Sequence, residues 1–103
     1  MSSGVARMQV GAVTGTGAII EVETLDFQPR YIRLLNVGGN AQGEWVEGMA
    51  DDSVQKVVDS GAGATDISLA TSDGITPKAN GFDIGADTDL NAAGELIHYI
   101  AFE

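Results

Sequence analysis

The chain has 103 residues, with 15 acidic and 5 basic side chains and a formal net charge of −10. This charge repels phosphate groups and anionic lipid headgroups, so we expect neither a nucleic acid nor a membrane as a partner. The length suits one domain around a single core, and the lack of cysteine excludes disulfides and thiolate metal sites. Many glycines and few aromatic residues predict short strands joined by turns.

The first segment, residues 1–18, is poor in large apolar side chains and predicts an N-terminal arm with a first edge strand. Residues 19–103 are expected to form a single β-sandwich domain. A strand is predicted within residues 17–27, where apolar residues alternate with Glu21 and Glu23. This period of two is typical of a strand with one face in water.

The next strand is predicted at residues 30–37, and apolar residues on both of its faces indicate a central position in a sheet. Further strands are expected at 44–49, 54–58, 67–70, 82–84 and 95–102, with turns or loops at 38–43, 59–65, 72–77 and 85–94. Seven or eight short strands at intervals of about ten residues favour an antiparallel β-sandwich of jelly-roll or Greek-key type.

The last loop has Asp87, Asp89 and Asn91 at alternate positions, as in a calcium-binding EF-hand. An EF-hand also needs glycine at its sixth and glutamate at its twelfth position, and this sequence has alanine and histidine there. A shallower calcium site built from Asp87, Asp89 and Glu95 stays open as an alternative. Turn chemistry explains the same residues, because Asp and Asn bond their own backbone in turns. We therefore predict a structural loop, with no metal and no cofactor.

No set of residues indicates catalysis. His98 is the only histidine, and its position in the most apolar strand favours a packed or hydrogen-bonded structural role over that of a base. Trp45, Tyr31 and Tyr99 could form a platform for a sugar, but so few aromatic residues are more often needed in the core. We predict no catalytic residue and no enzymatic activity.

Three segments in fixed order carry a resemblance to a known class of protein: LDFQPRYIRLLNV, EWVEGMADDSVQKVVDSGAGATDISLATSDGITP and GFDIGADTDLNAAGELIHYIAF. Over residues 17–102 the chain resembles small phage virion structural proteins of the head decoration, or cement, type. The resemblance implies a capsid decoration protein that binds the outside of the head shell and stabilises it. It also implies synthesis in the host cytoplasm, a place on the head exterior, and two partners: the major capsid protein and further copies of itself, with a trimer favoured.

We expect the contacts with the shell and between subunits to come from the N-terminal arm and from two of the few cations. These residues are Met1, Val5, Arg7, Met8, Val10, Arg30 and Arg33. For Arg30 and Arg33, salt bridges to Glu21 and Glu23 on the adjacent strand are an equal alternative. The alternative function is a tail or fibre-associated binding module, in which the loops at 38–43 and 85–94 recognise a glycan or a receptor.

Overall fold

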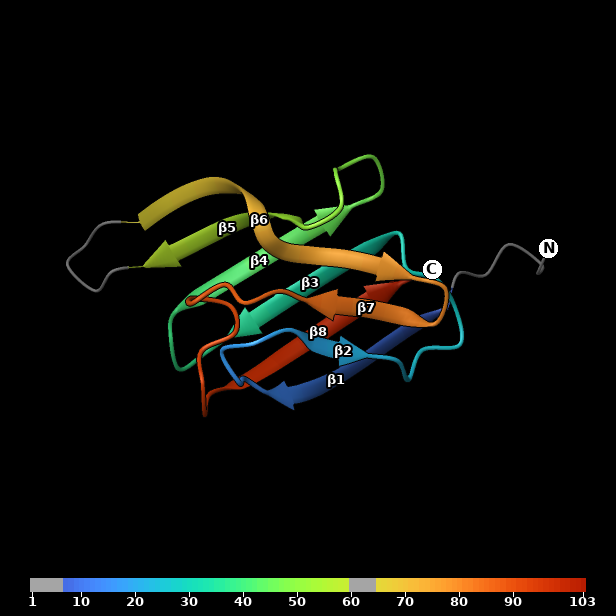
Figure 1. Cartoon of the computed structure of the whole chain (residues 1–103), viewed down its shortest axis with the longest axis horizontal. Helices are drawn as coiled ribbons and strands as arrows, with labels where there is room; N and C mark the ends of the chain where they lie inside the picture. Colours follow the sequence, from blue (N-terminus) through green and yellow to red (C-terminus); the bar gives the residue numbers. More distant parts are fainter. Residues whose placement is uncertain (1–6, 60–64) are drawn as a thin grey trace.

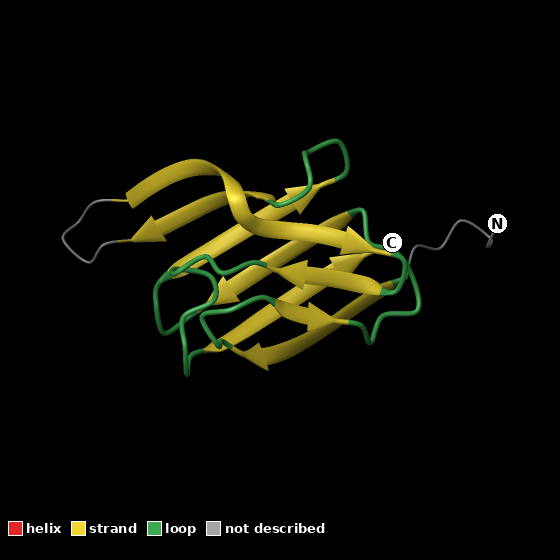
Figure 2. Cartoon of the chain, in the orientation of Figure 1, coloured by secondary structure: helices red, strands yellow, loops and turns green. Residues whose placement is uncertain are grey.

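The computed structural model describes residues 7–59 and 65–103. These residues form antiparallel strands joined by turns and loops, and none of them is helical (Figure 2), so none provides a helix long and apolar enough to cross a membrane. The strands are β1 (Met8–Thr14), β2 (Ile20–Val22), β3 (Tyr31–Asn36), β4 (Ala41–Val46), β5 (Ser53–Asp59), β6 (Thr65–Lys78), β7 (Gly81–Ile84) and β8 (Leu96–Phe102). The prediction of an all-β chain is confirmed.

All eight strands belong to one sheet, in the order β1-β8-β3-β4-β5-β6-β7-β2. The sequence predicted a sandwich of two sheets, but here a single sheet curls over on itself (Figure 1). The curl brings β7 against β8, where the rings of Phe82 and Tyr99 meet edge to face with centroids 5.3 Å apart. β3 is central, as predicted, because it pairs with both β4 and β8.

The predicted turn at residues 72–77 is wrong, because β6 runs through this segment as one long bent strand. Its first half pairs with β5 and its second half with β7, and the register shifts between Ser53 and Val54. The bend depends on Gly74, where an added Cβ would lie 2.5 Å from the backbone of Ser53, and on Asp73, which adopts a positive φ of 58°. The turn signal in the sequence therefore marks a bulge.

The predicted turn at residues 38–43 is shorter than expected, because β4 already begins at Ala41. The chain reverses before it, with Asn40 at a positive φ of 51°. Gly43 is a strand residue, and it is glycine because an added Cβ would lie 2.7 Å from side-chain atoms of both Leu90 and Val54. This glycine serves close packing and not a turn.

The N-terminal segment, where an arm and a first edge strand were expected, forms an edge strand at residues 8–14. This strand is β1, and it pairs along its whole length with β8. Gly11 lies over the ring of Tyr99, whose hydroxyl would be 2.5 Å from an added Cβ. The strand predicted within residues 17–27 is reduced to the three residues of β2. The loop expected at 59–65 falls mostly outside the described residues.

The core fills the inside of the curl. The following apolar residues are buried: Val22, Leu25, Phe27, Ile32, Leu34, Ala41, Trp45, Val54, Ile75, Phe82, Ile84, Leu90, Ile97, Tyr99 and Ala101. Trp45 and Tyr99 are thus core residues, as predicted, and the indole Nε1 of Trp45 donates to the carbonyl of Ala50 at 3.1 Å. One side of β8, β3 and β4 therefore packs on this core, and the other side faces away from it.

Candidate binding face

One side of six neighbouring strands faces away from the core. In β1, β8, β3 and β4, buried or half-buried side chains alternate with more exposed ones, and the strand register aligns the exposed ones in rows that continue onto β5. The first half of β6 continues these rows. We call this side the outer face (Figure 1).

The outer face consists of three rows that cross the strands. The first row is Met8, Phe102, Tyr31 and Val46; the second is Val10, Ile100, Arg33, Glu44, Gln55 and Leu69; the third is Ala12, His98, Leu35, Gln42, Val57 and Ile67. Five strand spacings of ~4.8 Å and about 20 Å of strand length give a flat projection of roughly 500 Å². That is the scale of one side of a specific protein interface, for which about 800 Å² of accessible area per partner is standard.

The outer face holds most of the exposed apolar side chains of the described residues. Nine large apolar residues are exposed in this part of the chain, and the outer rows with Leu96 at their end contain seven of them: Met8, Val10, Val46, Ile67, Leu69, Leu96 and Phe102. Ile67 and Leu69 are 68% and 58% exposed. In the second and third rows, the polar residues Arg33, Glu44, Gln42 and Gln55 lie between the apolar residues of β1 and β8 and those of β6. Exposed apolar groups on one face typically mark protein interaction sites.

Few charged side chains lie on the outer face, and two of them, Glu44 and Arg33, have hydrogen-bond partners within the chain. Of the 15 acidic residues, only Glu44 and, at the border, Asp59 belong to its strands on this side. Glu44 accepts a hydrogen bond of 2.5 Å from the hydroxyl of Tyr31. Burial, and then this carboxylate, raise the pKa of Tyr31, so it is a neutral donor. Arg33 donates to the side-chain oxygen of Gln42. The two charged side chains at the centre of the face, Glu44 and Arg33, are therefore opposite each other in the strand register and are each held by a hydrogen bond to a neutral side chain.

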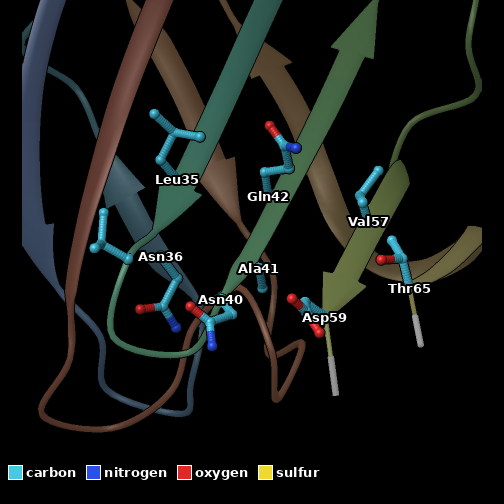
Figure 3. Close-up of a pocket in the computed structure, with 9 residues that line it drawn as sticks. Leu35, Asn36, Asn40, Ala41, Gln42, Val57, Asp59 and Thr65 are labelled. Carbon is cyan, nitrogen blue, oxygen red and sulfur yellow. The ribbon is translucent and has the colours of Figure 1, made fainter. Parts of the chain in front are cut away.

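A shallow hollow of about 380 Å³ lies at one end of the outer face (Figure 3). Leu35 and Val57 line it together with the amide side chains of Asn40 and Gln42. The turn between β3 and β4 forms one of its walls. It offers a small ligand both apolar contact and hydrogen-bonding groups.

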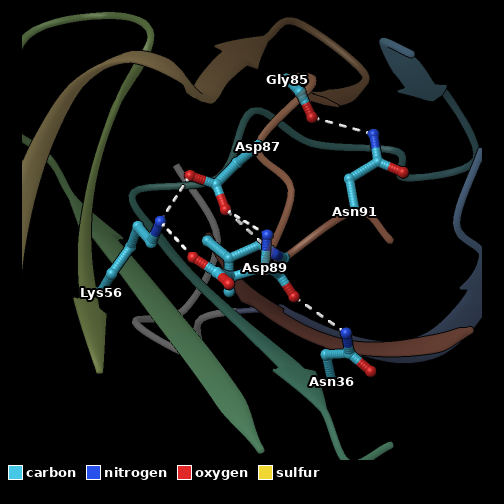
Figure 4. A network of polar contacts seen from close by, with 7 residues as sticks. Asn36, Lys56, Gly85, Asp87, Asp89 and Asn91 are labelled. Carbon is cyan, nitrogen blue, oxygen red and sulfur yellow. Dashed lines mark hydrogen bonds and ion pairs between the residues drawn. The ribbon is translucent and has the colours of Figure 1, made fainter. Parts of the chain in front are cut away.

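The loop at residues 85–95, which we call the closing loop, contains the residues that suggested calcium. The ammonium group of Lys56 lies between them, 2.8 Å from an oxygen of Asp87 and 2.7 Å from one of Asp89 (Figure 4). The other oxygen of Asp87 accepts from the backbone of Asp89 and Leu90, which is a turn bond of the predicted type. No group of three or more metal-binding side chains occurs in residues 7–59 and 65–103. The carboxylates thus bind an internal cation.

Burial of Lys56 disfavours its charge, but the hydrogen bonds and charges of Asp87 and Asp89 outweigh that effect and raise its pKa. Lys56 therefore stays charged in the folded chain at neutral pH. Because its side chain is only 14% exposed, this contact is shielded from solvent far better than a surface ion pair. No pattern in the sequence pointed to this lysine, since it stands 31 residues before Asp87.

Asn91 is the second anchor of the closing loop and is fully buried. Its amide nitrogen donates to the carbonyls of Ala18 and Gly85, at 2.6 and 2.8 Å, and its oxygen accepts from Thr16 and Gly17. Asn36 adds a further tie, donating to the backbone of Asp89 and to Glu95. These hydrogen bonds therefore attach the closing loop to the rest of the fold.

The residues predicted as contacts are placed differently from one another. Met8 and Val10 lie on the outer face. Arg7 has internal partners: its guanidinium contacts Glu103 at 2.5 Å and Asp26 at 3.4 Å and lies over the ring of Phe27. Two other predicted contacts, Met1 and Val5, lie outside the described residues.

The alternative for Arg30 and Arg33, salt bridges to Glu21 and Glu23, is wrong. Arg30 pairs with Glu47 at 3.7 Å, and Arg33 bonds Gln42. Glu21 of β2 and Glu23, which follows β2, lie near Lys78 instead, because β2 neighbours β7 and not β3. The alternation of Glu21 and Glu23 with apolar residues predicted a strand but did not show which strand lies beside it.

His98 is exposed in the third row of the outer face, between Ala12 and Leu35, and not packed as predicted. Tyr31 also lies on the outer face, where its ring contacts that of Phe102 at a centroid distance of 5.8 Å. The signal that could have identified this face was the presence of apolar residues on both sides of β3 and β8. The sequence alone indicated only that these strands were central.

Comparisons of the chain with family models, curated proteins and solved structures find no match.

Proposed function

We propose that the protein is a structural component of a phage particle, a capsid decoration protein that binds the major capsid protein on the outside of the head. The observation that carries this proposal is the outer face, a broad surface that exposes seven large apolar side chains and carries few charges on a chain of net charge −10. Docking through this face would bury its apolar side chains. The acidic residues elsewhere on the chain would keep the decorated particle soluble.

Stabilisation of the shell would follow from mass action. A protein that binds only the assembled shell favours that state over expanded or broken shells. No reactive group is needed for this role, since the energy comes from surface burial. The resemblance in the sequence directs the proposal to a phage head, and the outer face supplies a surface of suitable size.

The test is binding of purified variants to preassembled heads that lack this protein. Leu69→Glu places a charge in the second row of the outer face, and we expect at least a tenfold loss of affinity, about 1.4 kcal/mol. Ser72→Glu adds the same charge at an exposed position in the bulge of β6 and should bind like the wild type. Equal binding by both variants would remove the outer face from the mechanism.

The hollow supports a second candidate, a tail or fibre-associated module that binds a glycan. Its amides, Asn40 and Gln42, lie beside an apolar floor, a combination that sugar sites use. Calorimetry with a glycan panel tests this function. Heat that disappears in Asn40→Ala would favour it, and no heat with any glycan would leave head binding as the supported role.

A further inference from the structure

The two edges of the sheet differ in how well they are protected. β2 has only three residues and carries Glu21, so it offers little to an incoming strand. β1 has seven residues, and its sequence MQVGAVT contains no charge and no proline. Length, charge and proline are the usual ways in which proteins block edge pairing. β1 is therefore the edge that can accept another strand, and no further strand is drawn beyond it in Figure 1.

Two hydrogen bonds show which backbone groups of β1 point outward. The amide of Glu103 donates to the carbonyl of Arg7 at 2.8 Å, and the amide of Gly15 donates to the carbonyl of Glu95 at 2.7 Å. In an antiparallel pair, only alternate residues direct their N–H and C=O groups to a given neighbour. Odd-numbered residues of β1 therefore bond to β8, and even-numbered ones point to the free edge.

The residues that point outward are Met8, Val10, Ala12 and Thr14. Within the described residues, no hydrogen bond beyond the strand ladder involves the backbone of any of them. Four N–H groups and four C=O groups thus lie along this edge in alternation. They form a template for one antiparallel strand.

We propose that two copies of the chain pair through β1 in antiparallel fashion, across a two-fold axis at Gly11. In this register Val10 lies opposite Ala12 of the second copy, and Met8 lies opposite its Thr14. Every outward-pointing group of both edges then finds a partner. A two-fold register centred on any other residue leaves at least one of the four residues in each copy without a partner.

Gly11 suits the centre of this contact. Gly11 of one copy lies opposite Gly11 of the other in a pair without hydrogen bonds, where the Cα atoms approach to about 4.5 Å. The space where its side chain would lie is already filled by the ring of Tyr99. The backbones can therefore approach with no side chain of this residue between the copies.

The charges of the chain do not oppose this pairing. No charged side chain occurs between Met8 and Thr14, and Arg7 at the end of the strand is already paired with Glu103 and Asp26. Because opposite residues of a pair lie on the same face, Val10 of one copy adjoins Ala12 of the other on the outer face. The dimer thus joins two outer faces into one surface.

The proposal replaces the trimer that we expected from the sequence by a two-fold dimer. A three-fold ring needs a different strand to meet β1 in each contact, and the other edge, β2, is too short for that role. Pairing through β1 does not depend on binding to a capsid. It can be tested on the purified chain alone.

The experiment combines sedimentation equilibrium with amide hydrogen exchange in the wild type over a concentration series. We expect a monomer–dimer equilibrium in which the amides of Met8, Val10, Ala12 and Thr14 gain protection as the dimer forms. The amides of Gln9, Gly11 and Val13 should be protected at all concentrations, because they bond to β8. A chain that stays monomeric, or a dimer in which the even-numbered amides exchange freely, overturns the proposal.

Ala12→Pro provides the matching variant. Proline at this position removes an outward N–H and no bond to β8, so the monomer should fold. Each dimer loses two hydrogen bonds, and we expect association to weaken about 30-fold. Ala12→Ser keeps the N–H and should associate like the wild type. Equal association by the folded proline variant contradicts the proposed pairing, and if that variant does not fold, the exchange pattern of the wild type decides.

Discussion

The outer face and the closing loop use their side chains in opposite ways. On the outer face, apolar groups such as Leu69 and Ile67 are left uncovered, and they contribute little to the fold of the single chain. In the closing loop, polar groups are almost fully partnered by Lys56, Asn36 and Asn91. The closing loop, whose aspartates resemble a calcium site in the sequence, therefore maintains the structure. The part of the chain that looks like ordinary strands has the free surface.

The largest effect that separates the two regions should come from Asn91→Ala. This change removes four hydrogen bonds and leaves the amide of Thr16 and the carbonyl of Gly85 without the partner that Asn91 supplies, and we expect a loss of about 3 to 4 kcal/mol in the free energy of unfolding. Urea unfolding measures it. A loss below about 1 kcal/mol would mean that water replaces the amide and that the loop is less dependent on it than its geometry indicates.

Lys56→Met should have the second largest effect. It leaves Asp87 and Asp89 close together without a cation, and we expect a loss of about 2 kcal/mol, reduced from the value for a fully buried pair because Asp89 is partly exposed. The double variant with Asp87→Asn should recover part of that stability. No recovery would indicate that Lys56 acts through the packing of its aliphatic chain.

The same contact predicts a loss of stability at alkaline pH. The folded-state pKa of Lys56 is raised above its ordinary value of 10.5, so its contribution is complete below 10.5 and is lost as the pH rises through the folded pKa. The free energy of unfolding of the wild type should therefore fall more steeply above this pH than that of Lys56→Met. Parallel curves for both proteins would contradict the assignment.

The smallest effect on stability is expected on the outer face. Leu69→Ser should change the free energy of unfolding by less than about 0.5 kcal/mol, because the side chain has few contacts within the chain. Thermal unfolding measures this value. A large destabilisation would show that the hairpin of β5 and β6 depends on its exposed side chains, and that the outer face also serves folding.

Much of the fold could be predicted from the sequence, because period-two alternation is a local property. The central position of β3 followed from it, and the core roles of Trp45 and Tyr99 followed from the small number of aromatic residues. The turns predicted at Gly43 and Gly74 were wrong, since both glycines lie within strands, where Gly43 permits close packing and Gly74 a bulge. A glycine looks the same in sequence whether it permits a positive φ or a close approach.

The candidate site could be predicted only in part. Asp87 and Asp89 were correctly interpreted as turn residues, but their cation, Lys56, lies far away along the chain. The outer face depends on which strands are neighbours, and that is a property of the topology. Alternation told us that β3 has two apolar sides without showing that one of them is uncovered.

The most direct test of the account is cryo-electron microscopy of particles that carry this protein, at a resolution that places its strands. We expect the chain to lie on the head, with the outer face of β8, β3 and β4 against the shell. The closing loop should make no contact with the shell. A chain that sits elsewhere on the particle, or one on the head whose outer face is turned to solvent, would contradict it.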